Sequence, residues 1–236
     1  MGAADQDPGG PARLAIPIRL GIVFDLDGTL IDSRYDIANA ANHALSVNGF
    51  ATLLVPQIAS FVGDGARVLL ARAARLEPEA AELEPLLSSF LTYYAAHPTD
   101  HTLLLPGAHE ALAELAHLPL ALCTNKPRAI TDAVLGNLRL PVKFAAIVGG
   151  GDLPKIKPDP LPLQHIAQAL SLTPAELVMV GDGPQDILCA KAAGARSVAV
   201  EGGMQARERL LATNPDVVLA TLAGLPEVIE RWLNGA

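Results

Sequence analysis

The stretch "VFDLDGTLIDS" at residues 23–33 decides the fold, because an apolar run ends there in two closely spaced aspartates. The run spans residues 20–24 and stops at Asp and Gly, a pattern typical of a fully buried parallel strand. Asp25 and Asp27 follow it directly, so two like charges stand together at the end of a predicted core strand. Such a placement is unfavourable unless a nearby cation compensates the charges.

Similar apolar runs recur along the chain, and Ala- and Leu-rich segments with helical spacing separate them. This alternation predicts an α/β fold, a doubly wound parallel sheet with helices on both faces. One predicted helix begins at Pro184 and ends at Gly194, which is a plausible C-terminal cap. The further predicted strands lie in "LPLALCT" (118–124), "FAAIVGG" (144–150), "ELVMVGDG" (176–183), "RSVAVEGG" (196–203) and "DVVLAT" (216–221).

The block after the first strand breaks this alternation, because it contains no convincing strand. Its helical segments are "DIANAANHALSVNGF" (36–50), "GARVLLARAARL" (65–76) and "AAELEPLLSSFLTYYAAH" (80–97). The sequence therefore predicts a small all-helical domain at residues 33–104, inserted into a core formed by residues 17–32 and 105–236. Residues 1–16 are rich in Gly, Ala and Pro, which predicts a flexible tail.

Composition limits the class of partner. The net charge of −8 and an aromatic content of 4% disfavour nucleic acid, which needs clustered cations or stacking platforms. Only two cysteines are present, far apart in sequence, and they fit buried reduced thiols. No apolar run reaches the roughly 18 residues of a membrane span, and no signal peptide is recognisable. We expect a cytoplasmic protein without membrane partners, as a monomer or a homodimer.

Polar side chains follow several predicted strands at the point where each strand ends. In doubly wound sheets, ligands bind beyond the carboxyl ends of the strands, so these side chains should meet at one edge. Carboxylates, a hydroxyl, an amide and lysines are then brought together. They are Asp25 and Asp27, then Thr124, Asn125 and Lys126, then Lys155 and Lys157, and finally Asp182 and Asp186.

A divalent cation explains why Asp25 and Asp27 stand so close together. Mg²⁺ prefers hard oxygen ligands, and one or two carboxylates plus a substrate phosphate usually hold it. Asp182 would add a third carboxylate from another strand. Asp186 follows at i+4, where it could support the metal or fix Lys157.

This set of groups suits phosphoryl transfer. One aspartate can attack phosphorus and form an aspartyl-phosphate, while the other serves as general acid and then as general base. Backbone N–H groups at Gly28 and Thr29 are suited to phosphate oxygens. Thr124 can donate another hydrogen bond, and Lys157 can neutralise charge on the transferring group.

The chain resembles the haloacid dehalogenase superfamily of phosphohydrolases in four segments that occur in the expected order. They are "DLDGTL" (25–30), "CTNKP" (123–127), "IKPDP" (156–160) and "GDGPQD" (181–186). The resemblance implies that Asp25 is the nucleophile and a Mg²⁺ ligand, and that Asp27 is the acid/base and offers its backbone carbonyl to the metal. It also implies that Thr124 and Lys157 hold the phosphoryl group, with Asn125 beside them. Asp182 would be the acidic Mg²⁺ ligand with Asp186 next to it, and the helical insert would be the cap over the substrate.

Several residues near these motifs have ordinary structural interpretations. Asp32 or Ser33 is expected to cap the first helix of the insert. The "KPDP" context and the family pattern favour Lys157 over Lys155 as the phosphate ligand, so Lys155 is interpreted as a surface lysine and Lys126 as a solvated one. The six histidines show no metal-ligand spacing and are interpreted as surface or helix residues.

The loop "FVGDG" at residues 61–65 is open to two interpretations, a plain turn or a loop that contacts the substrate. For the second, Arg67 is the better candidate to bind an anion and Asp64 the alternative.

Within the superfamily, the motifs look most like those of phosphoglycolate phosphatases, which implies that the chain hydrolyses 2-phosphoglycolate to glycolate and phosphate. Gly183 departs from that group, in which serine is common at this position. Phosphatases of pyrophosphate, nucleotides or sugar phosphates, and a β-phosphoglucomutase-like phosphomutase, remain alternatives. A dehalogenase is disfavoured because the superfamily's dehalogenases lack the second aspartate, here Asp27. A non-catalytic binding protein is disfavoured because no motif residue is missing.

Overall fold

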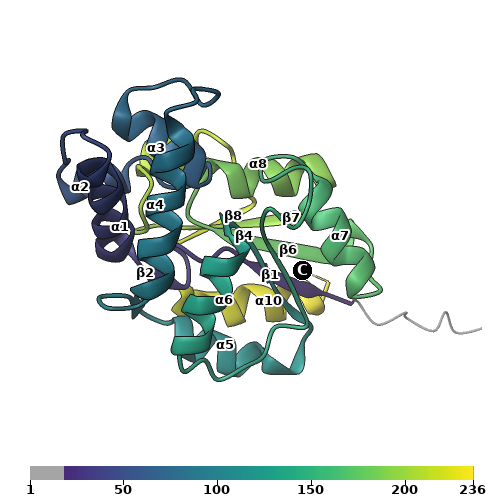
Figure 1. Ribbon diagram of the computed structural model, residues 1–236. Coiled ribbons are helices and arrows are strands. Elements are labelled where there is room, and N and C mark those ends of the chain that lie inside the picture. Colours follow the sequence, from purple (N-terminus) through teal and green to yellow (C-terminus); the bar gives the residue numbers. More distant parts are fainter. Residues whose placement is uncertain (1–18, 236) are drawn as a thin grey trace, which may run out of the picture.

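A single parallel sheet of six strands forms the centre of the molecule (Figure 1). The computed structural model describes residues 19–235. The strand order is β5-β4-β1-β6-β7-β8, and every neighbouring pair is parallel. The chain starts at the middle with β1, fills one side, and returns to fill the other, which is the doubly wound arrangement predicted from the sequence. The strands are β1 Gly21–Phe24, β4 Leu120–Pro127, β5 Ala146–Gly150, β6 Leu177–Gly181, β7 Arg196–Val200 and β8 Val217–Leu219.

Helices cover both faces of this sheet, because alternate side chains of the buried strands point to opposite sides. On β1, Ile22 and Phe24 pack in a cluster with residues of α5, α6 and α10. Val23, between them, packs in a second cluster with residues of α7 and α8. The covering helices are α5 Ala108–Glu114, α6 Arg128–Asn137, α7 Leu161–Ala169, α8 Pro184–Ala193, α9 Arg207–Leu211 and α10 Leu225–Leu233, with short 3₁₀ turns at Leu115–His117, Pro174–Glu176 and Leu222–Gly224.

The local sequence of helix α8 determines where the helix begins and where it ends. It begins at Pro184, whose fixed φ suits the first turn and whose missing N–H costs nothing there. It ends at Gly194, which adopts the left-handed conformation with φ 76°. Both boundaries are as predicted, and they place Asp186 in the first turn, facing the carboxyl edge of the sheet.

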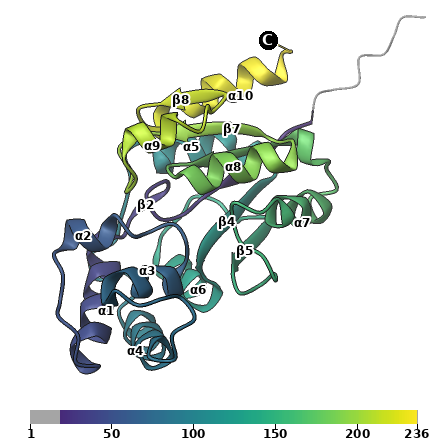
Figure 2. The ribbon, with the colours of Figure 1, turned by 90° about the horizontal axis from the view of Figure 1, so that it is seen from above.

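Four further helices gather away from the sheet, at the lower left of Figure 2. They are α1 Arg34–Val47, α2 Val55–Ala59, α3 Ala66–Ala74 and α4 Leu83–Ala96. Two short strands, β2 Ile31–Asp32 and β3 Leu103–Leu104, pair antiparallel where the chain leaves the sheet and returns to it. The sequence predicted neither this pair nor α2, because segments of two to five residues carry no usable periodicity.

The predicted cap of α1 differs from the observed one. Ser33 occupies the N-cap position, but its side chain makes no capping hydrogen bond. Its hydroxyl instead donates to Oδ1 of Asp27 at 2.5 Å, so the site takes the group that would have capped the helix. Asp32 accepts a hydrogen bond from the Arg34 N–H at 3.2 Å and pairs with the Arg34 guanidinium at 2.7 Å.

Two expectations concern the ends of the chain and its surroundings. The predicted tail at residues 1–16 lies outside the described residues. Within residues 19–235, no helix combines the length and the apolar character that crossing a bilayer requires.

Candidate active site

A group of three carboxylates lies at the carboxyl edge of the sheet. Asp25 follows β1, Asp182 follows β6, and Asp186 stands in the first turn of α8. Each offers an oxygen within 4.8 Å of the others, and all three side chains are buried. Buried like charges at this separation repel one another strongly unless a cation lies between them. The donor set of hard oxygens could therefore hold a divalent cation.

Two glycines make room for Asp182. A Cβ on Gly28 would lie 2.3 Å from Oδ2 of Asp182, and a Cβ on Gly203 would lie 2.2 Å from the same atom. Gly28 also has φ +87°, a conformation that other residues rarely adopt. The hydroxyl of Thr29 donates to Oδ1 of Asp182 at 3.3 Å, and the Met204 N–H donates to Oδ2 at 2.7 Å. These contacts fix the carboxylate in one orientation.

Lys157 joins two of the three carboxylates. Its ammonium donates to Oδ1 of Asp25 at 2.8 Å, to Oδ1 of Asp186 at 2.6 Å and to the Cys123 carbonyl at 2.6 Å. Burial alone would lower the pKa of Lys157, but Asp186 and Asp25 raise it above its usual value, so the side chain stays charged. Lys155 is exposed.

One ammonium does not balance three buried carboxylates. Burial, together with the charges of Asp25 and Asp186, raises the pKa of Asp182 to about 8. Burial also raises the pKa of Asp186 to about 7, although Lys157 acts in the opposite direction. In the absence of a cation, the folded protein therefore holds protons on these groups at pH values where an unfolded chain would have released them.

This excess of bound protons predicts that the metal-free protein loses stability as the pH rises. The contribution of Asp182 is complete below the pKa of an unfolded Asp, near 4, and is lost as the pH rises through about 8. In EDTA, the free energy of unfolding should fall by on the order of 1 kcal/mol per pH unit between pH 6 and 8. Denaturant titrations at several pH values measure this slope. Asp182→Asn should flatten it, and an equally steep slope in that variant would contradict the assignment.

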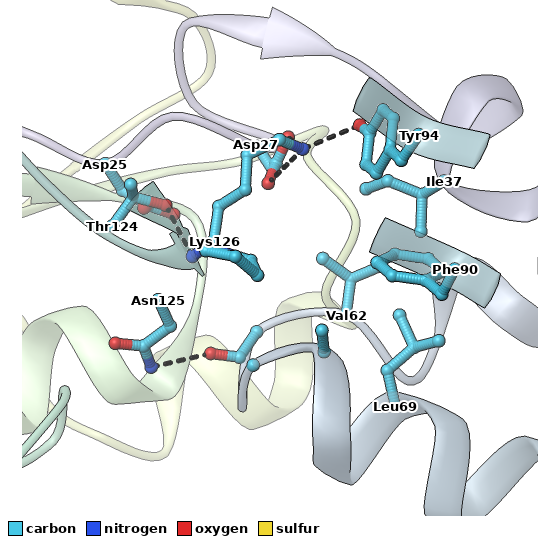
Figure 3. Close-up of a pocket in the computed structure, with 14 residues that line it drawn as sticks. Asp25, Asp27, Ile37, Val62, Leu69, Phe90, Tyr94, Thr124, Asn125 and Lys126 are labelled. Atoms are coloured by element: carbon cyan, nitrogen blue, oxygen red, sulfur yellow. Dashed lines mark hydrogen bonds and ion pairs between the residues drawn. The ribbon is translucent and has the colours of Figure 1, made fainter. Parts of the chain in front are cut away.

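Asp27 belongs to a different cluster. Its carboxylate accepts hydrogen bonds from the Lys126 ammonium at 2.9 and 3.1 Å, and that ammonium also donates to the Tyr94 hydroxyl at 2.6 Å (Figure 3). The interpretation of Lys126 as a surface lysine is therefore wrong, since its side chain is 3% exposed. Strand β4 continues past the predicted end at Thr124 to Pro127, with a shift of register after Cys123, and both Thr124 and Lys126 line the same pocket.

The backbone amides of the first motif are used differently from the prediction. The Gly28 N–H donates to the Ile31 carbonyl at 2.8 Å, and the Thr29 N–H donates to the Leu26 carbonyl at 3.3 Å. Both amides close the turn, so they are not available to a phosphate. The amides of Leu26 and Asp27 donate to no residue in the described part of the chain, and these two are the ones that could bind phosphate oxygens.

Asn125 connects the insert to the core. Its amide nitrogen donates to the carbonyls of Gly63 and Lys157, both at 2.8 Å, and its oxygen accepts from the Lys157 N–H at 3.0 Å. Both amide hydrogens are thus engaged, and the predicted substrate contact through them is not available. Asn125 instead holds the loop before α3 and the backbone of Lys157 in position.

A pocket opens between the carboxyl edge of the sheet and the insert (Figure 3). Arg67 does not line it, because its guanidinium pairs with Glu84 at 2.7 Å and donates to the Pro78 carbonyl. Asp64 pairs with Arg72 at 2.6 Å. In this structure neither of the two candidate residues of the insert, Arg67 or Asp64, lines the pocket. The core supplies Asp25, Asp27, Thr124, Asn125, Lys126 and Pro127 to the pocket, and the insert supplies Ile37, Val62, Gly63, Gly65, Ala66, Leu69, Phe90 and Tyr94.

Comparison with known proteins identifies the family. The sequence model of the haloacid dehalogenase-like hydrolase family matches residues 22–200 of the chain. A phosphoglycolate phosphatase of Chromobacterium violaceum is 42% identical over 188 residues, covering 77% of this chain and 85% of that protein. One of Pectobacterium atrosepticum is 37% identical and covers 89% and 92% of the two chains.

A solved structure agrees with this assignment. The crystal structure of a predicted phosphoglycolate phosphatase from Haemophilus somnus superposes with a TM-score of 0.82 at 29% identity, covering 91% of this chain and 99% of that one. The matches confirm the resemblance inferred from the four motifs. The chain belongs to the haloacid dehalogenase-like hydrolase family.

Proposed function

We propose that this protein is a Mg²⁺-dependent phosphatase that hydrolyses a small phosphate monoester through an aspartyl-phosphate on Asp25. The observation that carries the proposal is the position of the Asp25 carboxylate. It lies in the pocket, bonded to Lys157 and within 4.8 Å of two other carboxylates, and the two amides that could bind phosphate oxygens follow it directly in the chain. A carboxylate in such surroundings can act as a nucleophile toward phosphorus.

The carboxylates of Asp25, Asp182 and Asp186 would hold the metal, and the resemblance adds the backbone carbonyl of Asp27. A bound Mg²⁺ would supply positive charge that stabilises the phosphoryl oxygens and lets the carboxylates remain ionised together. The ammonium of Lys157 keeps Asp25 oriented in its place.

The chain's own groups carry the two chemical steps. In the first, an oxygen of Asp25 attacks phosphorus, and the ester oxygen leaves with a proton from the Asp27 carboxyl group. In the second, the Asp27 carboxylate removes a proton from water, which attacks the aspartyl-phosphate and regenerates Asp25. The Thr124 hydroxyl accepts a hydrogen bond from the backbone N–H of Lys126 at 3.2 Å, so the hydrogen of that hydroxyl can be donated to a phosphoryl oxygen.

The substrate we propose is 2-phosphoglycolate, which would give glycolate and phosphate. Its support comes from relatives named phosphoglycolate phosphatase that cover most of the chain. Helices α1–α4 would form the cap, since they supply the apolar wall of the pocket. The two described cysteines, Cys123 and Cys189, are free and buried, which agrees with an enzyme of the reducing cytoplasm.

A panel of phosphate esters tests this function. Phosphate release is measured from 2-phosphoglycolate, pyrophosphate, nucleoside monophosphates, several sugar phosphates and p-nitrophenyl phosphate, each with Mg²⁺ and with EDTA. We expect 2-phosphoglycolate to lead in kcat/KM by about tenfold or more, which corresponds to roughly 1.4 kcal/mol of transition-state preference. EDTA should abolish all activity.

The remaining outcomes separate the alternatives. A different leading ester would keep the mechanism and replace the substrate. Transfer of phosphate to a sugar hydroxyl rather than to water would identify a phosphomutase. Full activity in EDTA would contradict the metal-dependent mechanism.

A further inference from the structure

We propose that Lys126, together with Tyr94, recognises a carboxylate on the substrate and so selects short phosphorylated carboxylic acids. The inference rests on the proposed phosphatase function and assigns the residues that choose among monoesters. Lys126 comes from the core strand β4, and Tyr94 comes from helix α4 of the insert. Their polar atoms meet beside Asp27 in the pocket (Figure 3).

The first observation that supports this role of Lys126 is the charge of the pocket. Among the described residues that line it, Lys126 is the one with a positive charge, and Ile37, Val62, Leu69 and Phe90 form an apolar wall. Lys157 does not line the pocket, because Asp25, Asp186 and a backbone carbonyl surround its ammonium. Beside the metal that the phosphate would contact, a further negative group on the substrate therefore finds one cationic side chain in the described lining, that of Lys126.

The second observation is the hydrogen-bonding capacity of Lys126 and Tyr94. An ammonium has three donors, and Lys126 directs two contacts to the Asp27 carboxylate and one to the Tyr94 hydroxyl. When Asp27 carries the proton that it gives to the leaving group, one of its oxygens no longer needs the ammonium, and one N–H of Lys126 becomes available. The Tyr94 hydroxyl accepts from Lys126, and its own hydrogen is donated to none of the residues at 19–235. The two groups can therefore offer an ammonium N–H and a phenol O–H to the same anion. Burial raises the pKa of Tyr94 to about 12, which keeps that hydrogen in place at neutral pH.

The third observation concerns the short distance between the leaving ester oxygen and the group that Lys126 would bind. The proposed acid Asp27 must reach the ester oxygen that leaves, and Lys126 is bonded to Asp27 at 2.9 Å. A group recognised by Lys126 must therefore lie close to that ester oxygen. In 2-phosphoglycolate a single methylene separates the ester oxygen from the carboxylate. Sugar phosphates and p-nitrophenyl phosphate carry no negative charge there.

A comparison between two substrates tests this role. The value of kcat/KM for 2-phosphoglycolate is divided by that for 2-hydroxyethyl phosphate, an alkyl ester whose leaving group also needs a proton but which lacks the carboxylate, in the parent, Lys126→Gln and Tyr94→Phe proteins. Both variants should lower the ratio, Lys126→Gln by about tenfold or more, because they remove charge-assisted or neutral hydrogen bonds to the carboxylate. Lys155→Gln, a matched change at an exposed lysine, should leave the ratio unchanged.

The outcomes separate the inference from the function on which it rests. Equal losses for both substrates would overturn it, because they would show that Lys126 only positions Asp27. If Lys126→Gln loses all activity, Tyr94→Phe decides: a loss confined to 2-phosphoglycolate supports the inference, and an equal loss or no loss overturns it. A parent enzyme that hydrolyses 2-hydroxyethyl phosphate as well as 2-phosphoglycolate, with no preference for the carboxylate, would refute the inference and keep the phosphatase. A parent that hydrolyses neither would refute the function itself.

Discussion

Asp25→Asn is expected to reduce phosphate release by at least about four orders of magnitude while leaving the fold intact. The neutral amide is a poor nucleophile, so the covalent step is lost rather than slowed. The amide oxygen can still accept the hydrogen bond that Lys157 now gives to Asp25 at 2.8 Å. The shape of the side chain is kept, and one of three buried like charges is removed.

Two measurements check this expectation. Phosphate release from the best ester gives the loss of rate, and thermal unfolding in EDTA at pH 8 gives the stability. The melting temperature should stay the same or rise, because the repulsion on Asp182 and Asp186 decreases. Asp32→Asn is the control, since Asp32 lies in the same segment but pairs with Arg34. Turnover of Asp25→Asn near the parent rate would exclude the aspartyl-phosphate, provided the intact mass shows no deamidation.

The core of the fold could be predicted because the apolar composition of its central strands indicates that these strands are buried. A parallel strand with helices on both faces must be apolar throughout, so the central strands appear as apolar runs, and the runs of β1, β5 and β6 end at Asp or Gly. Strand β6 has five buried residues in succession. The same rule places the polar residues after each run at one edge, and that is where Asp25, Asp182 and Lys157 are found.

The insert could be predicted less well, because the partners of its side chains depend on how helices pack. Arg67 stands on α3 near a loop, which made it a reasonable anion ligand from sequence. The packing of α3 against α4 instead sets its guanidinium beside Glu84. The position of a residue along a helix determines the face of the helix on which it lies. Which residue it contacts depends on the helix that packs against that face.

The turn after β1 was predicted in the correct place but with the wrong donors. A sequence of the form "DGTL" indicates a tight turn, yet it does not say which amides close the turn and which stay free. The structure uses the amides of Gly28 and Thr29 internally and leaves those of Leu26 and Asp27. Lys126 was missed for a different reason: the sequence predicted that the strand ends at Thr124, and a lysine beyond a strand end is usually solvated, whereas β4 in fact continues through Lys126 to Pro127.

Asp27→Asn is expected to lower steady-state turnover by about 10²- to 10⁴-fold, which is the usual contribution of a positioned acid/base. The variant should also separate the two chemical steps. p-Nitrophenolate leaves without needing a proton, so its release should continue to one equivalent per enzyme. Hydrolysis of the aspartyl-phosphate needs a base to activate water, so release should then become slow.

Rapid mixing of enzyme with p-nitrophenyl phosphate measures this burst, and 2-phosphoglycolate, whose leaving alkoxide needs a proton, should give none. Asp25→Asn should give no burst with either ester, because it has no nucleophile to trap the phosphoryl group. A burst in Asp25→Asn and none in Asp27→Asn would reverse the two assignments. The structure favours the order argued here, because Lys157 binds Asp25 within the acidic group, whereas Asp27 stands outside it with Lys126 and Ser33.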